Sequence, residues 1–230
     1  MSKQGVYAKG EIRRKKIISS GIRLFLENGY GNTTTAKIMS DAGMSQSAFF
    51  ASFESKEDLL KELVELMFDS QFKLAESLCT NENPLLVYAV ETVLQLHITE
   101  LSEPLRELYM EAYSLPSTSE LIRISTAQKL AGIFKSYLPD AQEKDFYEIE
   151  IASGSVMRGF MSKKCDMYFT FDRKVRRFLE CSFKLFDVPS KDYLPVIDAV
   201  ANMDLQHIAE DTIDDTVRKA EENFEAVMAM

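Results

Sequence analysis

The sequence predicts an all-α fold, and three observations support this expectation. Apolar residues recur at helical spacing in most stretches between proline-containing or polar breaks. No convincing run alternates apolar and polar residues as a half-exposed strand would, and only 167–171 could form a short extended connection. The 230 residues are 46% apolar and 27% charged, which is ordinary for a globular chain with a sizeable core.

The first 54 residues predict three helices separated by turns. Apolar periodicity indicates a helix over 11–28, which leads with basic residues. A second, short helix is expected to be capped by Thr33 or Thr34. The turn at Ala42–Gly43 then leads into a third helix, which Ser45 can cap.

A long fourth helix should join these three helices to the rest of the chain. It begins with a capping-box pattern at Ser55 and Asp58 and runs toward Cys79. Beyond a polar break, seven further helices are expected at 84–101, 104–113, 119–137, 142–164, 172–186, 192–203 and 205–228. Prolines are expected in the first helical turn at positions 84 and 104, and in connections at positions 116, 139 and 189.

Charge divides the chain into a basic amino-terminal end and an acidic remainder. Residues 1–60 carry nine lysines and arginines against six acidic residues, a net charge of +3. The remainder carries 18 basic and 30 acidic side chains, a net charge of −12, and the pI of the whole chain is about 4.9. Contact with nucleic acid is therefore expected only at the amino-terminal end.

The spacing of reactive residues argues against an enzyme, a metal centre and a disulfide framework. Cys79, Cys165 and Cys181 form no C-x-x-C pair, and His97 and His207 show no metal-binding spacing. The sequence holds no phosphate-binding glycine loop and no nucleophile elbow, so we expect neither catalysis nor a cofactor, although a spatially assembled site stays open. It also shows no secretory segment and no membrane-spanning stretch, which predicts a cytoplasmic protein without membrane contact.

Residues 35–53, TAKIMSDAGMSQSAFFASF, have the spacing of a helix-turn-helix. Gly43 permits the tight turn, and the helix that begins at Ser45 directs its first turn outward. Ser45, Gln46 and Ser47 are then free to meet base edges in the DNA major groove. A polar turn that only caps a surface helix would show the same triplet, but the surrounding pattern favours DNA contact.

An ordered set of short motifs runs through residues 13–60. Its members are Ile17, Gly21, Leu24, Phe25, Asn28, Gly29, Tyr30, Thr33, Thr34, Ile38, Ala42, Gly43, Met44, Ser45, Phe53, Ser55, Lys56, Glu57, Asp58, Leu59 and Leu60. This set resembles the DNA-binding head of the tetracycline-repressor (TetR) family of transcriptional regulators. The resemblance implies a helix-turn-helix DNA-binding domain at 1–54 and a larger helical domain for ligand binding and dimerisation at 55–230.

The resemblance also implies which residues contact DNA. They are Arg13, Arg14, Thr33, Thr34, Thr35, Lys37, Ser45, Gln46, Ser47, Phe50, Ser52 and Lys56. Hydroxyls and amides can donate to phosphates or bases, and the cations supply salt-dependent affinity. The basic run at 13–16 could otherwise be a solvated helix face, and Phe50 could equally pack against the protein.

Two positions depart from the family pattern. Phe50 stands where a tyrosine is common, so a hydroxyl that would bond a phosphate is absent, and Glu54 stands where a basic residue is frequent. The resemblance predicts a ligand-responsive regulator that binds a palindromic double-stranded operator as a homodimer. We expect a repressor, because blocking a promoter requires no further contact surface. The alternative is a dimeric helical sensing or interaction protein whose DNA-binding head is weakened.

Aromatic residues of the long fourth helix and of 84–137 predict a ligand pocket. A small apolar or aromatic effector is expected there, although each residue could instead be ordinary core. The candidate lining residues are Phe72, Tyr88, His97, Tyr109, Met110, Tyr113, Phe134 and Tyr137.

Dimerisation is expected through the helices at 142–164 and 172–186, which could form a four-helix bundle with their counterparts in a second copy. Their apolar residues could also pack within one copy. The carboxy-terminal helix at 205–228 is amphipathic, so we expect it to pack against the larger domain or the partner subunit.

Overall fold

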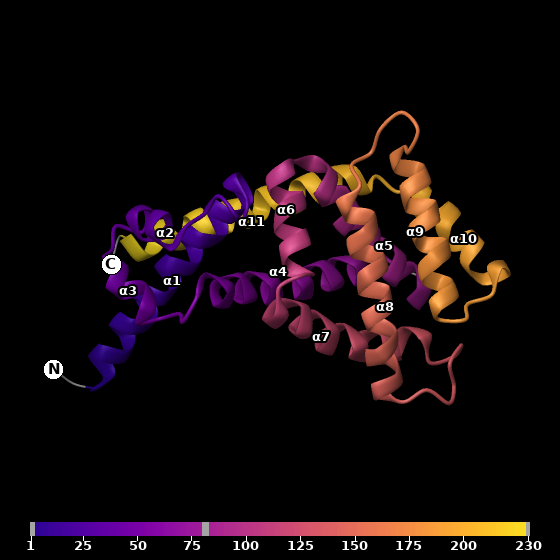
Figure 1. Cartoon of the computed structure of the whole chain (residues 1–230), viewed down its shortest axis with the longest axis horizontal. Coiled ribbons are helices and arrows are strands. Elements are labelled where there is room, and N and C mark those ends of the chain that lie inside the picture. Colours follow the sequence, from indigo (N-terminus) through magenta and orange to yellow (C-terminus); the bar gives the residue numbers. More distant parts are fainter. Residues whose placement is uncertain (1–2, 80–82, 229–230) are drawn as a thin grey trace.

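The computed structural model describes residues 3–79 and 83–228, and within these ranges it contains eleven helices and no strand (Figure 1). The prediction of an all-α fold is confirmed. The helices are α1 Lys3–Asn28, α2 Thr35–Asp41, α3 Gln46–Phe50, α4 Lys56–Leu78, α5 Pro84–Leu101, α6 Glu103–Ala112, α7 Pro116–Phe134, α8 Glu143–Ser162, α9 Phe171–Leu185, α10 Ser190–Ala201 and α11 Leu205–Met228.

Two expected helix boundaries were wrong. Helix α1 begins at Lys3 rather than at residue 11, because its first turns are helical without the apolar periodicity that would have revealed them. Helix α7 begins at Pro116 and ends at Phe134, three residues earlier at each end than expected. Pro116 occupies the first helical position, where its fixed φ suits the helix and its missing N–H is not needed.

Helices α1 to α3 and the start of α4 form a compact head around an apolar core. Ile17, Phe25 and Phe49 are fully buried in it. Gly21 lets α1 approach α4, since a Cβ at this position would lie 2.4 Å from Leu59 Cδ2. A larger side chain would therefore push the two helices apart.

Helix α4 links the head to the larger domain (Figure 1). Its predicted capping box is confirmed: the Asp58 N–H donates to Ser55 Oγ at 3.1 Å, and the Ser55 N–H donates to Asp58 Oδ2 at 2.9 Å. The apolar face of α4 stays buried from Leu59 to Ala75, so one rigid helix belongs to both regions.

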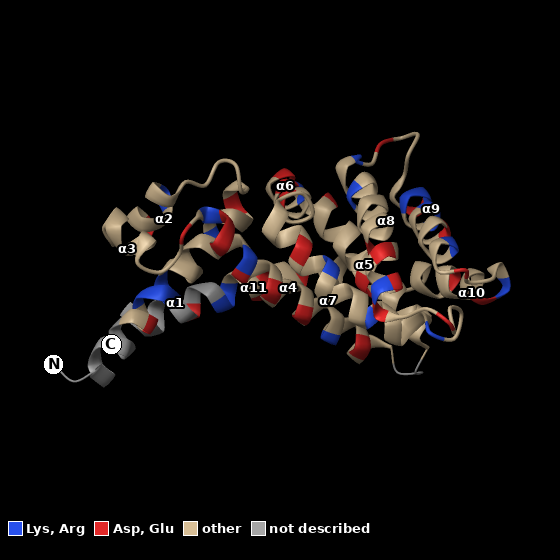
Figure 2. Ribbon diagram, turned by 60° about the horizontal axis from the view of Figure 1, so that its bottom comes forward, with Lys and Arg blue, Asp and Glu red and all other residues tan. Residues whose placement is uncertain are grey.

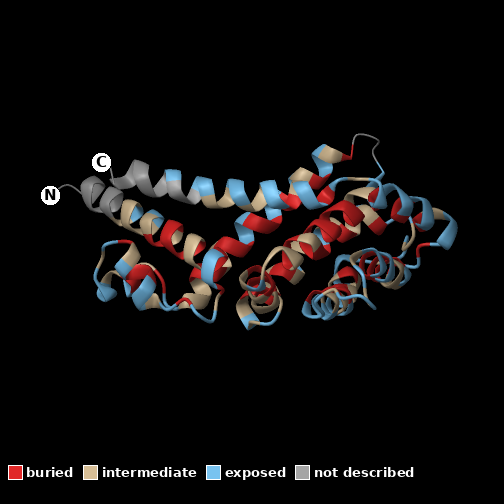
Figure 3. Ribbon diagram, turned by 90° about the horizontal axis from the view of Figure 1, so that it is seen from above, coloured by how far each residue is buried: buried red, intermediate tan, exposed pale blue. Residues whose placement is uncertain are grey.

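Helix α5 is the centre of the larger domain. It contacts α4, α6, α7, α8, α9, α10 and α11, and its residues are buried along most of its length (Figure 3). Such a helix must be apolar nearly all round, which makes the few polar residues on it informative.

The expected dimer helices use their large apolar residues inside the subunit. Val175, Phe178, Leu179 and Phe183 of α9 are all buried within one chain, which is the alternative that the sequence left open for these helices. Their burial follows from the packing of α9 against α8, α5 and α10. Small side chains of α8 remain exposed, at Ala152, Ser155 and Gly159.

Helix α11 returns from the larger domain to the head. It packs along α5 and then along α1, and both views show it beside α1 (Figures 1 and 3). Packing against the larger domain was expected, whereas contact with the head was not. Two residues of the predicted apolar stripe, Phe224 and Val227, lie outside the side chains that the structure describes.

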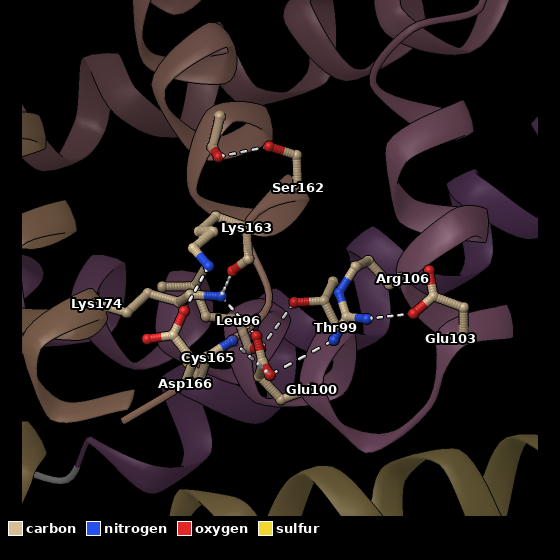
Figure 4. A network of polar contacts seen from close by, with 11 residues as sticks. Leu96, Thr99, Glu100, Glu103, Arg106, Ser162, Lys163, Cys165, Asp166 and Lys174 are labelled. Carbon is tan, nitrogen blue, oxygen red and sulfur yellow. Dashed lines mark hydrogen bonds and ion pairs between the residues drawn. The ribbon is translucent and has the colours of Figure 1, made fainter. Parts of the chain in front are cut away.

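A buried ionic network ties α5, α6 and α9 together (Figure 4). Lys174 is fully buried, and its Nζ donates to Glu100 Oε1 at 2.5 Å and to the Lys163 carbonyl. Arg106 Nη2 lies 3.4 Å from Glu100 Oε2 and Arg106 Nη1 lies 2.6 Å from Glu103 Oε2. Burial by itself would raise the pKa of Glu100, but Lys174 and the other donors outweigh burial and lower it.

Candidate nucleic-acid interface and core cavity

The helix-turn-helix of the head consists of α2, the turn at residues 42–45 and α3. Gly43 has a φ of +65°, the left-handed conformation that the turn requires. Thr34, not Thr33, caps α2, because its hydroxyl accepts from the Lys37 N–H at 3.2 Å. Ser45 occupies the cap position of α3, but its hydroxyl is 3.0 Å from Ser47 Oγ instead of capping the helix.

Several predicted DNA contacts lie on the outer surface of this motif. Thr34, Lys37, Ser45, Gln46, Ser47 and Phe50 are exposed, and Thr35 is half-buried. Gln46 Nε2 donates to Thr35 Oγ1 at 2.8 Å, so the amino-terminal ends of α2 and α3 meet in one surface. We call these seven residues the recognition face. Phe50 is 61% exposed and packs edge-on against Phe49, 5.5 Å between ring centroids.

Two predicted DNA contacts, Thr33 and Lys56, have side chains that bond within the head instead. Thr33 is fully buried and its hydroxyl lies 2.9 Å from the Gly29 carbonyl, so its side chain is absent from the recognition face. Lys56 Nζ donates to the carbonyls of Tyr30 at 2.7 Å and Thr33 at 2.9 Å, and lies 3.8 Å from the Tyr30 ring centroid. Lys56 therefore holds the connection between α1 and α2, and burial lowers its pKa.

Arg14 likewise binds the protein rather than projecting from it. Its Nη1 donates to the Ser52 carbonyl at 2.9 Å, its Nη2 pairs with Glu62, and its guanidinium lies 4.4 Å from the Phe53 ring centroid. Arg13 and Ser52 are half-buried, and Arg13 Nε is buried without a hydrogen-bond partner. The sequence placed all three on a phosphate-contacting surface, but these contacts give Arg14 a structural role.

Charge is distributed in the structure as the sequence predicts. Basic residues mark α1 near the head, and acidic residues recur along α4 and α7 (Figure 2). Arg23 of α1 pairs with Asp41 at the end of α2 and with Glu27 at 3.4 Å, which fixes the orientation of α2 on α1. Lys37 donates to the Asn32 carbonyl at 2.8 Å while remaining exposed, and it is the lysine of the recognition face.

The larger domain touches the head through α6. Glu107 Oε1 accepts from the Gly31 N–H at 2.6 Å, in the connection that leads into α2. Gly29 in the same connection has a φ of +81°, and a Cβ there would lie 2.2 Å from Glu107 Oε2. Movement of α6 would therefore be transmitted to the start of the helix-turn-helix.

A small cavity of about 20 Å³ lies inside the larger domain, between α4, α5, α7, α8 and α9. Three of the predicted ligand-binding residues line it: Phe72, Tyr88 and Tyr113. An adjoining cavity of about 40 Å³ shares Tyr113, Glu150 and Gly154 with the first. We call the two together the core cavity.

The other predicted pocket residues lie elsewhere. Phe134 stacks on Phe186 with ring centroids 3.9 Å apart, and Tyr109 accepts from Gln71 Nε2 at 2.5 Å beside a separate apolar cavity. Met110 is partly buried against the core, and Tyr137 is near Asp192 of α10. Tyr109, Met110, Phe134 and Tyr137 therefore do not line the core cavity.

His97 is on the opposite side of α5 from the core cavity. It follows Tyr88 by nine residues, which is two and a half helical turns, so the two side chains point in opposite directions. The His97 ring lies 4.0 Å from the Phe171 ring at the start of α9. Burial lowers the pKa of His97 to about 4, so the ring is neutral at physiological pH.

Sequence reasoning missed the polar residues of the core cavity. Glu91 and Glu150 line it and are only 2% and 3% exposed. Gln95 Nε2 donates to Glu91 Oε1, and Gln95 Oε1 accepts from the Tyr113 hydroxyl at 2.9 Å. Ser153 Oγ donates to Glu150 Oε2 at 2.6 Å.

A signal for these residues was present in the spacing. Tyr88, Glu91, Thr92 and Gln95 share one face of α5, and Glu150, Ser153, Gly154 and Met157 share one face of α8. Polar residues at i, i+3 and i+4 on a helix that is otherwise apolar indicate a buried polar site.

Burial shifts the ionisation of both carboxyl groups. It raises the pKa of Glu91 to about 7 and that of Glu150 to about 8, and hydrogen bonds from Gln95 and Ser153 oppose the shift in each case. Within residues 3–79 and 83–228, no lysine or arginine forms an ion pair with either carboxylate. Lys129 and Arg123 favour the charged forms of Glu91 and Glu150 through space, but among the described residues neither carboxyl group has a cation in ion-pair contact.

A larger groove of about 630 Å³ lies between α1, α4 and α11, outside the region expected to hold a ligand. The described residues contain no group of three histidine, cysteine, aspartate or glutamate side chains that could hold a metal ion. None of the described helices is both long and apolar enough to cross a membrane.

Comparisons with known proteins find a family match for the amino-terminal head. Residues 17–63 match the family model described as bacterial regulatory proteins, tetR family. The chain is 30% identical over 111 residues to an uncharacterized HTH-type transcriptional regulator, YuxN, of Bacillus subtilis, covering 47% of this chain and 38% of that protein. It is 28% identical over 111 residues to the HTH-type transcriptional regulator QacR of Staphylococcus aureus, covering 46% and 59% of the two chains.

The chain spans only part of the curated relatives that it matches. The matched segments cover between 17% and 59% of the length of four such proteins. Among solved structures, the chain is similar to a crystal structure of a gamma-butyrolactone receptor (ArpA like protein), with a TM-score of 0.47 and 18% identity. That similarity covers 87% of this chain and 99% of the other.

Proposed function

We propose that this chain, which carries the amino-terminal domain of the tetR family of bacterial regulatory proteins, is a ligand-responsive transcriptional regulator. It binds a specific DNA operator through the recognition face, and binding of an effector in the larger domain weakens that contact. The observation that carries the proposal is the exposed polar surface where α2 and α3 meet, held together by the hydrogen bond between Gln46 and Thr35.

The chemistry of the recognition face suits the DNA major groove. The Gln46 amide can donate and accept in one plane, as recognition of an adenine edge requires. The hydroxyls of Thr34, Ser45 and Ser47 can donate to phosphates or bases, and Lys37 adds a phosphate-directed charge. A rigid apolar core beneath this surface keeps the two helices in register.

We infer a homodimer because one short recognition helix reads too few bases to select an operator. Two heads related by a two-fold axis would read a palindromic site, with half-sites spaced by the helical repeat of DNA. The exposed small residues Ala152, Ser155 and Gly159 of α8 allow close approach of a second copy. Repression follows most simply, since a bound dimer blocks a promoter without a further contact surface.

Helix α6 provides a route between the core cavity and the head. Tyr113, directly after α6, lines the cavity and bonds Gln95, while Glu107 on the same helix holds the connection before α2. An effector that displaces Tyr113 would shift α6 and with it the head. For this to lower DNA affinity, the effector must bind the DNA-incompetent arrangement more tightly than the competent one.

A second candidate is a helical sensing or interaction protein with a weakened head. The observation that favours it is the internal use of Arg14 and Lys56, which leaves fewer cations for phosphates. Exposed Glu54 would in addition repel the DNA backbone.

Binding to the DNA upstream of the protein's own coding sequence separates the two candidates. We expect a shifted band in gel electrophoresis that withstands competitor DNA and weakens between two salt concentrations. Gln46→Ala should reduce specific affinity by about 1–3 kcal/mol and leave nonspecific affinity unchanged, because it removes a base contact. Lys37→Ala should weaken specific and nonspecific binding alike, since it removes a phosphate contact.

Gln206→Ala is a matched control, because Gln206 is an exposed glutamine of α11 that bonds only to Glu210 at 3.1 Å. It should leave both affinities unchanged. Equal loss of specific and nonspecific binding in Gln46→Ala would show that Gln46 does not read bases. Absence of any specific complex would favour the second candidate.

A further inference from the structure

We propose that the groove between α1, α4 and α11 is a second ligand site, separate from the core cavity, and that it binds an elongated, neutral alcohol. The apolar part of the ligand lies along α4, and its hydroxyl group donates to Gln71 Oε1. The groove has a volume of about 630 Å³, which is within the range of small-molecule sites. This inference goes beyond the proposed function, which uses only the recognition face and the core cavity.

One face of α4 forms the floor of the groove. Its lining residues recur at spacings of three and four, so they share one side of the helix over about four turns. They are Leu63, Leu66, Met67, Ser70, Gln71, Leu74 and Leu78. Leu66 is 56% exposed, and Leu74 and Leu78 are half-buried. The protein thus leaves part of an apolar helix face open, which favours an elongated apolar ligand.

Helices α1 and α11 form the two walls of the groove. Ile18 and Ile22 of α1 and Ile208 of α11 line it with apolar side chains. Thr212 and Thr216 of α11 line it as well, and their hydroxyls donate to backbone carbonyls one turn earlier, each at 2.7 Å. They therefore offer methyl groups rather than free hydroxyls. Among the described residues α11 packs against α1 and α5 rather than against α4, so space remains between α11 and the floor.

Gln71 supplies the polar point of recognition. Its side chain is 1% exposed, and it lines the groove but not the core cavity. Its Nε2 donates to the Tyr109 hydroxyl at 2.5 Å, and Tyr109 does not line the groove. Gln71 Oε1 is buried and accepts no hydrogen bond from the described residues. A buried amide oxygen without a donor is unfavourable, so this atom favours a ligand that brings a hydroxyl group.

The ligand reaches Gln71 between its neighbours on the helix. Met67 and Leu74 lie one turn before and one turn after Gln71 and line the same groove. The Met67 side chain is unbranched and can adapt to a ligand, and Leu74 is only half-buried. Small movements of these two side chains would bring a hydroxyl group within hydrogen-bonding distance of Gln71 Oε1.

The charges of the groove favour a neutral ligand. Asp211, Asp215 and Lys219 of α11 line it and are exposed, and Asp215 already pairs with Arg218 at 2.6 Å. A fatty-acid anion would therefore meet two carboxylates against one lysine. A charged group of either sign beside the buried Gln71 amide would lose its hydration without gaining a counter-ion.

A ligand in this groove would touch both regions of the chain. Ile18 and Ile22 belong to the head, whereas Ile208 and Thr212 belong to the helix that returns from the larger domain. Binding should therefore stabilise the packing of α11 against the head. Exchange of the backbone amide hydrogens of α11 should become slower, because local opening of this helix would require release of the ligand.

The test compares 1-decanol with its isomer 1-methoxynonane, an ether that cannot donate a hydrogen bond, by calorimetric titration of the chain without DNA. We expect the alcohol to bind at least tenfold more tightly than the ether and than decanoate at pH 8. It should also slow amide hydrogen exchange within residues 205–219. Equal affinity for alcohol and ether, no binding of the alcohol, tighter binding of decanoate, or unchanged exchange in α11 would overturn the proposal.

Ser70→Trp is the variant that locates the site. Ser70 is exposed and lines the groove, so a large side chain there fills the groove without entering the core. We expect 1-decanol to bind at least tenfold more weakly. Ser77→Trp is the matched control, because Ser77 is exposed on the same helix and does not line the groove. Decanol affinity that is the same in Ser70→Trp and the wild type would contradict the site.

Gln71→Leu tests the hydroxyl contact, since it removes the amide and keeps an apolar side chain. We expect the alcohol to lose its advantage over the ether, while affinity for the ether stays unchanged. Tyr109 also loses its partner in this variant, so a normal melting curve is checked first. If the variant does not fold, the comparison of alcohol with ether in the wild type and in Ser70→Trp decides. An alcohol that keeps its advantage in folded Gln71→Leu would overturn the proposed contact.

Discussion

Helix α5 carries a buried glutamate, Glu91, and a partly buried one, Glu100, with opposite surroundings. Glu91 and Glu100 are nine residues apart, so their side chains point in opposite directions. Glu100 meets Lys174 at 2.5 Å and Arg106 at 3.4 Å, and its pKa is lowered. Glu91 meets only the amide of Gln95 and shares its cavity with Glu150, and its pKa is raised to about 7.

The difference shows how the surroundings of a carboxyl group on one helix set its charge. Around Glu100 the protein supplies its own cations, and the resulting network joins three helices (Figure 4). Around Glu91 the protein supplies aromatic rings and a second acid, and burial raises the pKa of this carboxyl group more than Gln95 and Lys129 lower it. Burial alone does not decide the role; the partners do.

The largest expected effect is loss of the structural network. Lys174→Met should destabilise the fold by about 3–5 kcal/mol, because Glu100 loses its closest cation while remaining largely buried. The free energy of unfolding in urea measures this.

Arg177→Met is the control on the same helix. Arg177 is 65% exposed in its side chain and pairs only with Glu180, so its replacement should change stability by about 0–1 kcal/mol. A loss below about 1 kcal/mol in Lys174→Met would show that the network is not structural.

A smaller effect of opposite sign is expected at the unpaired site. Glu150 has a folded pKa of about 8, above its unfolded value, so its contribution to stability is full below about pH 4.5. That contribution is lost as the pH rises through 8. Glu150→Gln does not titrate, so relative to its difference from the wild type at pH 5 it should gain on the order of 3 kcal/mol at pH 8.

Unfolding curves at the two pH values measure this gain. Glu148→Gln is the control, because Glu148 is exposed on the same helix, and it should show no such gain. A Glu150→Gln variant whose difference from the wild type is the same at pH 5 and pH 8 would mean that Glu150 titrates normally. Burial would then not shift the ionisation of this core-cavity carboxyl group, and the contrast between the core cavity and the Glu100 network would fail.

The head was predictable from sequence because its signals are local. Gly43, the cap at Thr34 and the capping box at Ser55 each act within a few residues, and the apolar spacing defines the helices around them. Long-range partners were not predictable. Nothing near Lys56 in the sequence indicates that Tyr30 and Thr33 hold it, and Arg14 meets Glu62 across 48 residues.

The core cavity was predictable only in part. Aromatic residues suggested a pocket, but which of them face it depends on the rotation of each helix, and this placed His97 on the wrong side of α5. Glu91 and Glu150 lie on separate helices, 59 residues apart, and become a pair only through packing. Their polar spacing within apolar helices was the usable signal.

Reciprocal coupling between the core cavity and the operator tests the central claim most directly. Affinity of the chain for a fluorescent operator fragment would be measured with and without a saturating ligand of the larger domain, found by calorimetric screening, and affinity for that ligand with and without operator. We predict that each ligand weakens the other by the same factor of at least ten, about 1.4 kcal/mol of coupling. Operator affinity that is identical in the presence and absence of the bound ligand would contradict the account.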